Sequence, residues 1–188
     1  NKSGITHRLV NFANILVGHL RGGLAHANII ASIFFAGMTG AAVSDTAAIG
    51  TMLIPAMVED GYDKDFSAAV TAASSIIGPT IPPSNMMVIY GSLMGVSIAG
   101  LFAAGFIPGL LLGGMLMILS GYISKKRGYP KKEKRSSIKE MVVAFWDAIL
   151  ALLMPVIILG GILSGVFTPT EAASIAVAYA FLVGKFVF

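Results

Sequence analysis

Gly78-Pro79-Thr80-Ile81-Pro82-Pro83-Ser84-Asn85 interrupts an apolar run that extends from residue 66 to residue 124 without a formally charged side chain. Three prolines in five residues cannot continue an α-helix, because proline lacks a backbone N–H and its ring clashes with the preceding turn. At about 1.5 Å per helical residue, the run is long enough for two membrane crossings. The sequence therefore predicts a broken helix over residues 66–93, made of two half-helices joined by unwound backbone, and a helix over residues 97–124.

The composition of the whole chain indicates a polytopic α-helical membrane protein. Of the 188 residues, 56% are hydrophobic and only 12% are charged, and the mean hydropathy is +0.84. An average soluble domain is about a quarter charged, and a transmembrane barrel needs alternating segments of about ten residues. The chain has long apolar runs instead, so the soluble, disordered and barrel classes are excluded.

A second apolar segment, residues 24–58, carries small residues around one charged side chain. Asp45, flanked by Ser44 and Thr46, is the only formally charged residue between positions 22 and 58. The segment is long for one crossing and short for two, which predicts a re-entrant helical hairpin with its tip near Ser44. An intramembrane Asp marks a functional site by default. Two interpretations stay open: Asp45 ligates directly, or it caps the helix that leaves the tip.

The proline-rich break is the other candidate site. Backbone groups freed inside hydrocarbon survive only within protein or beside water, and carbonyls at the ends of half-helices can coordinate Na⁺. Thr80, Ser84 and Asn85 add side-chain oxygens beside the carbonyl of Gly78, and hard oxygen ligands suit an alkali cation. The alternative is a purely structural kink. A hairpin tip that meets the break would form one pocket from two irregular segments.

Surface segments flank these two features. Residues 1–21 place apolar side chains at helical spacing among polar ones, which is typical of an interfacial amphipathic helix. Residues 125–147 are predicted to be a basic loop followed by an interfacial helix. The loop, residues 125–135, holds seven Lys or Arg against one Glu, which predicts a cytoplasmic position. Counting crossings then places residues 59–65 on the same side and residues 91–97 on the other.

Residues 148–188 are predicted to contain a further crossing, up to about residue 166, and one more helix. Thr168 and Glu171 have the spacing of a capping box, and Pro169 stands at the first helical position. The last helix should therefore begin at this point.

Several other functions lack their motifs here. The chain has no Cys, which excludes a thiolate nucleophile and a Cys-ligated metal. It has no Ser-His-Asp arrangement, phosphate-binding loop or dinucleotide fingerprint. Most of the excess charge behind the net +4 lies in the basic loop beside an apolar span, which favours membrane lipid over nucleic acid as a partner. We expect a protein that is not an enzyme and has no cofactor.

The chain resembles the large membrane subunit (DctM type) of the tripartite ATP-independent periplasmic (TRAP) transporters. The motifs that carry the resemblance cover nearly the whole chain in the family's order: LVGH (16–19), GGLA (22–25), GAAVSDTAA (40–48), IGPTIPPS (77–84), LFAAGFIPG (101–109) and GVFTPTEAA (165–173). The resemblance implies the inverted-repeat fold of the ion transporter superfamily. Residues 22–124 would belong to the transport domain of the first repeat, and residues 148–188 would be the first, scaffold helices of the second.

The resemblance also implies a function. It is Na⁺-coupled import of an organic acid by elevator-type alternating access, in the cytoplasmic (inner) membrane of a bacterium or archaeon. A periplasmic binding protein would deliver the acid, and a small four-helix membrane subunit would accompany the chain. Na⁺, the coupling ion, would bind at a site carried over onto the residues Ser44, Asp45, Gly78, Thr80 and Pro82, with Thr46, Ser84 and Asn85 beside it in the Na⁺ and substrate region.

Two alternatives belong to other classes. Channels also use re-entrant segments and carbonyl ligands, so an ion or solute channel subunit is the second interpretation, and a purely structural membrane subunit is the third. Within the transporter interpretation, the residues do not choose between a C4-dicarboxylate, a sialic acid and another organic acid.

Overall fold

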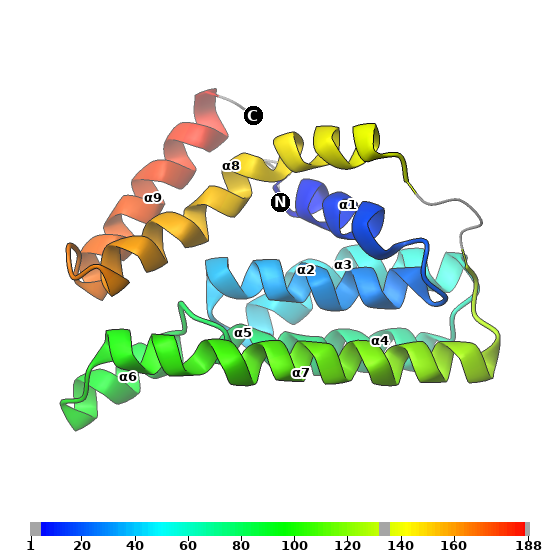
Figure 1. Cartoon of the computed structure of the whole chain (residues 1–188), viewed down its shortest axis with the longest axis horizontal. Coiled ribbons are helices and arrows are strands. Elements are labelled where there is room, and N and C mark those ends of the chain that lie inside the picture. Colours follow the sequence, from blue (N-terminus) through cyan, green and yellow to red (C-terminus); the bar gives the residue numbers. More distant parts are fainter. Residues whose placement is uncertain (1–4, 132–135, 187–188) are drawn as a thin grey trace.

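The computed structural model describes residues 5–131 and 136–186, which form nine helices and no strand (Figure 1). The all-helical prediction is confirmed over these residues. Parts of the predicted first helix (residues 1–4) and basic loop (132–135), and the last two residues, lie outside the described ranges. Helix α1 is described over Ile5–Val17, and it ends at Val17, before the predicted end at residue 21.

Helices α2 (Gly23–Thr39) and α3 (Ala42–Glu59) form the hairpin. Gly40 adopts φ 58°, a left-handed conformation that ends α2 and that side chains with a Cβ rarely adopt. The tip is therefore Gly40 and the residue after it, and the predicted tip near Ser44 is wrong. Ser44 lies in the first turn of α3, because the chain reverses as soon as Gly40 permits it.

The broken helix has three pieces: α4 (Lys64–Ser75), the single turn α5 (Ile77–Thr80) and α6 (Asn85–Met94). Only residues 81–84 leave the helical path, and they contain a cis bond between Pro82 and Pro83. The break is thus shorter than predicted, since residues 78–80 are helical. A proline is tolerated in the first turn of a helix, where the backbone N–H has no intrahelical partner in any case.

Helix α7 (Ile98–Arg127) lies along the hairpin and the broken helix (Figure 1). Its glycines make the close approach possible. A Cβ on Gly105 would lie 2.6 Å from the Thr80 carbonyl oxygen, and one on Gly113 would lie 2.9 Å from Cδ1 of Ile33. A Cβ on Gly109 would collide with Ile81. The break therefore packs against the middle of α7.

The start of α2, the turn before α4 and the end of α7 lie together at one end of the molecule. The Gly22 N–H donates to the Pro130 carbonyl at 3.0 Å. Asp63 accepts hydrogen bonds from the Tyr129 hydroxyl and from Arg127, each at 2.6 Å, and both interactions, Tyr129 first, hold the pKa of Asp63 below its usual value. The acidic turn and the start of the basic loop thus share one side, as counting crossings predicts, while the turn after α6 lies at the opposite end (Figure 1).

Helices α8 (Ile138–Leu163) and α9 (Pro169–Phe186) pack against each other (Figure 1). The first half of α8 also packs against α1, through Ala144, Ala148 and Ala151. The structure has one α8, which contains Pro155, where the sequence predicted an interfacial helix up to residue 147 and a crossing from 148. The predicted capping box is confirmed: the Thr168 N–H donates to Glu171 at 2.8 Å, and the Glu171 N–H donates to the Thr168 hydroxyl at 3.3 Å.

Within the described ranges, α7 and α8 are the two helices long and apolar enough to cross a membrane. Helix α7 has 30 residues, and α2 has 17, which correspond to about 45 Å and about 25 Å. Since α2 starts beside the end of α7, the hairpin tip reaches only part of the way along α7.

The glycine face of α7 gives a stability prediction. Gly109→Ala should lower the stability by about 1–3 kcal/mol, because the new methyl group must displace Ile81 in a packed contact. Gly114→Ala is the matched control, since a Cβ there meets no atom within 4 Å. Thermal unfolding of the purified variants in detergent measures both, and equal melting temperatures would show that α7 does not press against the break.

Candidate functional site

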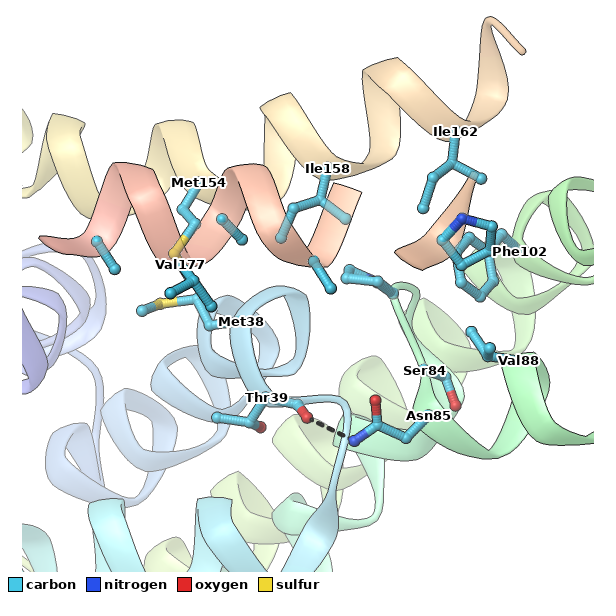
Figure 2. A pocket seen from close by; sticks show the side chains of 15 residues that line it. Met38, Thr39, Ser84, Asn85, Val88, Phe102, Met154, Ile158, Ile162 and Val177 are labelled. Carbon is cyan, nitrogen blue, oxygen red and sulfur yellow. Dashed lines mark hydrogen bonds between the residues drawn. The ribbon is translucent and has the colours of Figure 1, made fainter. Parts of the chain in front are cut away.

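The hairpin tip and the break meet, as the sequence predicts. A Cβ on Gly40 would lie 2.6 Å from the Pro83 carbonyl oxygen, so only glycine fits between the two segments. The Asn85 side chain donates from Nδ2 to the Thr39 carbonyl at 3.3 Å, which joins the start of α6 to the end of α2 (Figure 2). The two irregular segments therefore form one site.

Asp45 is the charged group of this site. Its side chain is fully buried, at 0% exposure. Oδ1 accepts a short hydrogen bond from the Thr39 hydroxyl, whereas Oδ2 has no hydrogen-bond partner in the described part of the chain. Oδ2 lies against Gly78, where a Cβ would collide with it. A buried carboxylate oxygen without a partner is costly unless a cation or a proton compensates it.

The structure rules out one of the two interpretations of Asp45. The N-cap of α3 is Ala41, which makes no side-chain hydrogen bond, and Asp45 lies three residues into the helix. Asp45 accepts its hydrogen bond from a side chain across the tip rather than from a backbone N–H of α3. The capping interpretation is therefore wrong, and the carboxylate remains available to a ligand near the positive end of α3.

Four of the other predicted residues, all with hydroxyl groups, make no hydrogen bond to Asp45. Their hydroxyl groups donate to backbone carbonyls: Ser44 to Ala41 at 2.8 Å, Thr46 to Ala42 at 2.9 Å, Thr80 to Ile76 at 2.9 Å and Ser84 to Pro79 at 2.7 Å. Ser44 and Asn85 are exposed, whereas Pro82 and Ser84 are buried. The structure thus brings Asp45 and Gly78 together and links Asn85 to them through Thr39.

This donor set suits an alkali cation better than a transition metal. No group of three or more His, Cys, Asp or Glu side chains that could hold a metal occurs among residues 5–131 and 136–186. The candidate ligands are the free carboxylate oxygen of Asp45 and the backbone carbonyl of Gly78 beside it. Of the other α5 carbonyls, Ile77 accepts from the Ile81 N–H and Pro79 accepts from the Ser84 hydroxyl. Such a set of hard oxygen atoms favours Na⁺ over softer ions.

Thr39 is the residue of the site that sequence reasoning missed. Its hydroxyl and its carbonyl bind the two predicted segments, Asp45 on one side and Asn85 on the other. The available signal was its place directly before Gly40, a glycine among small residues where the chain can reverse.

A cavity of about 330 Å³ opens beside the tip and the break. Thr39, Ser84 and Asn85 supply its polar edge, and apolar side chains of α7, α8 and α9 supply most of the remaining wall (Figure 2). Phe102 is among these apolar residues and is fully buried. The cavity therefore lies between the hairpin and break on one side and the α8 and α9 pair on the other.

A buried polar cluster fixes the hairpin to α4 below the site. The Asn28 amide donates to the Thr71 hydroxyl at 2.7 Å, and the Ser74 hydroxyl donates to the Asn28 amide oxygen at 3.3 Å. The Ser32 hydroxyl donates to the Ser74 oxygen at 2.8 Å. Because all four side chains are buried, loss of one would leave its partners unsatisfied. The hairpin and α4 are thus held as one unit.

The whole chain, residues 1–188, matches the sequence model of the DctM component of the tripartite ATP-independent periplasmic transporters. It is 50% identical over 191 residues to the sialic acid TRAP transporter large permease protein SiaM of Vibrio cholerae, which covers 100% of this chain and 44% of the relative. It is 48% identical over 184 residues to the isethionate TRAP transporter permease protein DctMQ of Oleidesulfovibrio alaskensis (98% and 29%). Identity to the C4-dicarboxylate TRAP transporter large permease protein DctM of Pseudomonas aeruginosa is 42% over 185 residues (98% and 43%).

The fold and the comparisons define a helical membrane protein of a transporter family. The chain belongs to the DctM component of the TRAP transporters, and it spans less than half the length of each of these relatives. The relatives are named as permeases, a class that moves solutes rather than transforming them.

The contact between Asp45 and Gly78 gives a prediction about stability. Gly78→Ala should destabilise the protein by about 1–3 kcal/mol, because its Cβ collides with a fixed carboxylate. In the Asp45→Ala background the same change should cost at least about 0.5 kcal/mol less, because the obstacle is gone. Thermal unfolding of the four proteins completes the cycle, with Gly160→Ala as a control in open space. Additive effects would place Asp45 away from Gly78.

Proposed function

We propose that this chain is part of the large membrane subunit of a Na⁺-coupled importer of an organic acid. The observation that carries the proposal is the buried Asp45 carboxylate, with a free oxygen directed at Gly78 where the hairpin tip meets the break. A bound Na⁺ would compensate this charge, with Oδ2 and the Gly78 carbonyl as ligands. Ser44, Thr80 and Pro82 remain part of the proposed Na⁺ site, and Thr46, Ser84 and Asn85 remain part of the surrounding Na⁺ and substrate region.

The cavity beside the tip supports the substrate side of the proposal. Asn85 lies at the first turn of α6, a helix of 10 residues whose N-terminus faces the polar edge of the cavity. Helix N-termini attract anionic groups. The relatives are named for sialic acid, isethionate and C4-dicarboxylates, all of which are organic acids. An anionic substrate beside a bound cation would neutralise part of its charge, which is the physical basis of coupling.

The arrangement also fits an elevator mechanism. In this proposal, the hairpin, the broken helix and α7 carry the site, and α8 and α9 belong to the scaffold. The polar cluster between α2 and α4 and the close contact with α7 make the first group rigid, while the mostly apolar cavity wall toward α8 and α9 contains few polar atoms that would resist sliding.

The complete assembly follows from the family. A small membrane subunit of four helices and a periplasmic substrate-binding protein would be the partners, and the chain would lie in the cytoplasmic (inner) membrane of a bacterium or archaeon. A channel subunit would let solute equilibrate but could not concentrate it. Accumulation of solute against its gradient, driven by Na⁺ in liposomes, separates the two functions.

Asp45→Asn should weaken the Na⁺ dependence of uptake while the protein still inserts. Removing one negative charge beside a bound cation costs on the order of 1 kcal/mol or more where screening is poor, so half-maximal uptake should need about tenfold more Na⁺. Asp60→Asn is the matched control, because it removes the same charge from the exposed end of the same helix. Uptake by the complete permease in liposomes, titrated with Na⁺ at constant ionic strength, provides the measurement. An unchanged titration for Asp45→Asn would remove this residue from the cation site.

The orientation of the chain gives another prediction. The end of α7 carries Lys125, Lys126 and Arg127, and positive residues next to a span stay in the cytoplasm. In intact cells, an impermeant thiol reagent should label a cysteine introduced by Val96→Cys, between α6 and α7, but not one introduced by Ser136→Cys before α8. The chain has no cysteine of its own. The reverse labelling pattern would invert the proposed orientation.

A further inference from the structure

Thr39 occupies a position that no other described residue shares, because it binds both halves of the site. Its hydroxyl donates to Oδ1 of Asp45, and its backbone carbonyl accepts from Nδ2 of Asn85 at 3.3 Å. Thr39 and Asn85 also line the cavity of about 330 Å³, whereas Asp45 does not. Thr39 therefore lies between the proposed cation ligand and the proposed substrate cavity and contacts both.

The hydroxyl of Thr39 has one proton and two acceptors within reach. The Phe35 carbonyl lies 3.4 Å away, one turn back along α2, whereas Asp45 is closer and lies across the tip. A charged carboxylate is the stronger acceptor, so the hydroxyl donates to Asp45 as long as the carboxylate is ionised. This bond fixes Oδ1 and leaves Oδ2 directed toward Gly78.

The backbone carbonyl of Thr39 binds the second part of the site, the start of α6. Gly40 follows it in a left-handed conformation and lies so close to Pro83 that the tip cannot shift without moving the break. Asn85 donates to this carbonyl with its amide nitrogen, and its amide oxygen is turned toward the cavity (Figure 2). The position of Thr39 therefore sets the position of the polar edge of the cavity.

We infer that Thr39 is a positioning residue that couples cation binding at Asp45 to organic-acid binding in the adjacent cavity. A cation that draws Oδ2 toward Gly78 orders Asp45, and Asp45 orders Thr39 through the hydroxyl. Thr39 in turn holds Asn85 where the acid binds. The inference rests on the proposed function, because it requires a cation at Asp45 and an acid in the cavity.

Coupling of this kind is reciprocal: the acid must tighten Na⁺ binding by the same factor by which Na⁺ tightens acid binding. A ligand that binds the folded protein raises its melting temperature in a concentration-dependent way. The test is the melting temperature of the complete purified permease, titrated with NaCl against choline chloride. Titrations are made without organic acid and with saturating sialic acid, isethionate or succinate.

Three variants test the hydrogen bond between the Thr39 hydroxyl and Asp45. Thr39→Val keeps the shape and removes the hydroxyl, and it should raise the Na⁺ concentration of half-maximal stabilisation about tenfold or more without any acid. Thr39→Ser keeps the hydroxyl and should stay within about twofold of the parent. Thr51→Val is the matched control on the exposed side of α3, where the hydroxyl bonds only to the Ala48 carbonyl, and should change nothing.

Asn85→Ala tests the link between Thr39 and the cavity. It removes the bond from Asn85 to the Thr39 carbonyl and leaves the bond between the Thr39 hydroxyl and Asp45 in place. In this variant, the shift that the acid produces in the Na⁺ midpoint of the parent, on the order of fivefold or more, should disappear. Asn85→Ala thus provides a test even where Thr39→Val fails to assemble.

The outcomes separate this inference from the proposed function. If Asp45→Asn abolishes the Na⁺ response but Thr39→Val keeps the parent midpoint, the cation site stands and the role of Thr39 is wrong. If Asn85→Ala retains the full acid-induced shift, or if no acid shifts the midpoint of the parent, the coupling is wrong. If Na⁺ does not stabilise the parent at all, the proposed function fails and the inference fails with it.

Discussion

A carboxylate buried in a membrane helix hairpin is the constraint on which the other features of this chain depend. Asp45 has no exposed surface, and among the described residues only one of its two oxygens has a hydrogen-bond partner, the hydroxyl of Thr39. Since an uncompensated charge in a low-dielectric interior is costly, the surrounding structure must bring a compensating group to the second oxygen. Gly78 of α5 lies against that oxygen, so the broken helix has to meet the hairpin beside Asp45.

The small residues of the chain make this meeting possible. Gly40 ends α2 and lets the tip approach Pro83, Gly78 gives Asp45 its space, and Gly105 and Gly109 let the break lie against α7. Each of these contacts would be blocked by a single Cβ atom. The glycines are therefore spread along the sequence but gathered around the break in the fold, and they allow irregular backbone to be enclosed by protein rather than exposed to lipid.

Much of this architecture could be predicted from the sequence, because its strongest signals are local. Three clustered prolines predict a broken helix, and a lone Asp among small residues predicts an intramembrane site. The errors have physical causes too. The small residues around Ser44 permit a turn anywhere among them and so predicted a tip near Ser44, but the left-handed Gly40 decides the reversal. The change in polarity near residue 147 suggested a helix boundary, yet polarity alone does not break backbone hydrogen bonds. The place of Thr39 before Gly40 is visible in the sequence, but its bonds to Asp45 and Asn85 depend on how the chain folds back and are not.

The most direct measurement is the position of a heavy monovalent cation in crystals of the complete permease. Tl⁺ binds oxygen sites that hold alkali cations and has a strong anomalous signal. We expect an anomalous peak within coordination distance of Asp45 Oδ2, between α3 and Gly78, and its loss in Asp45→Asn. Crystals that show Tl⁺ elsewhere and none beside Asp45, or that keep the peak in Asp45→Asn, would contradict it.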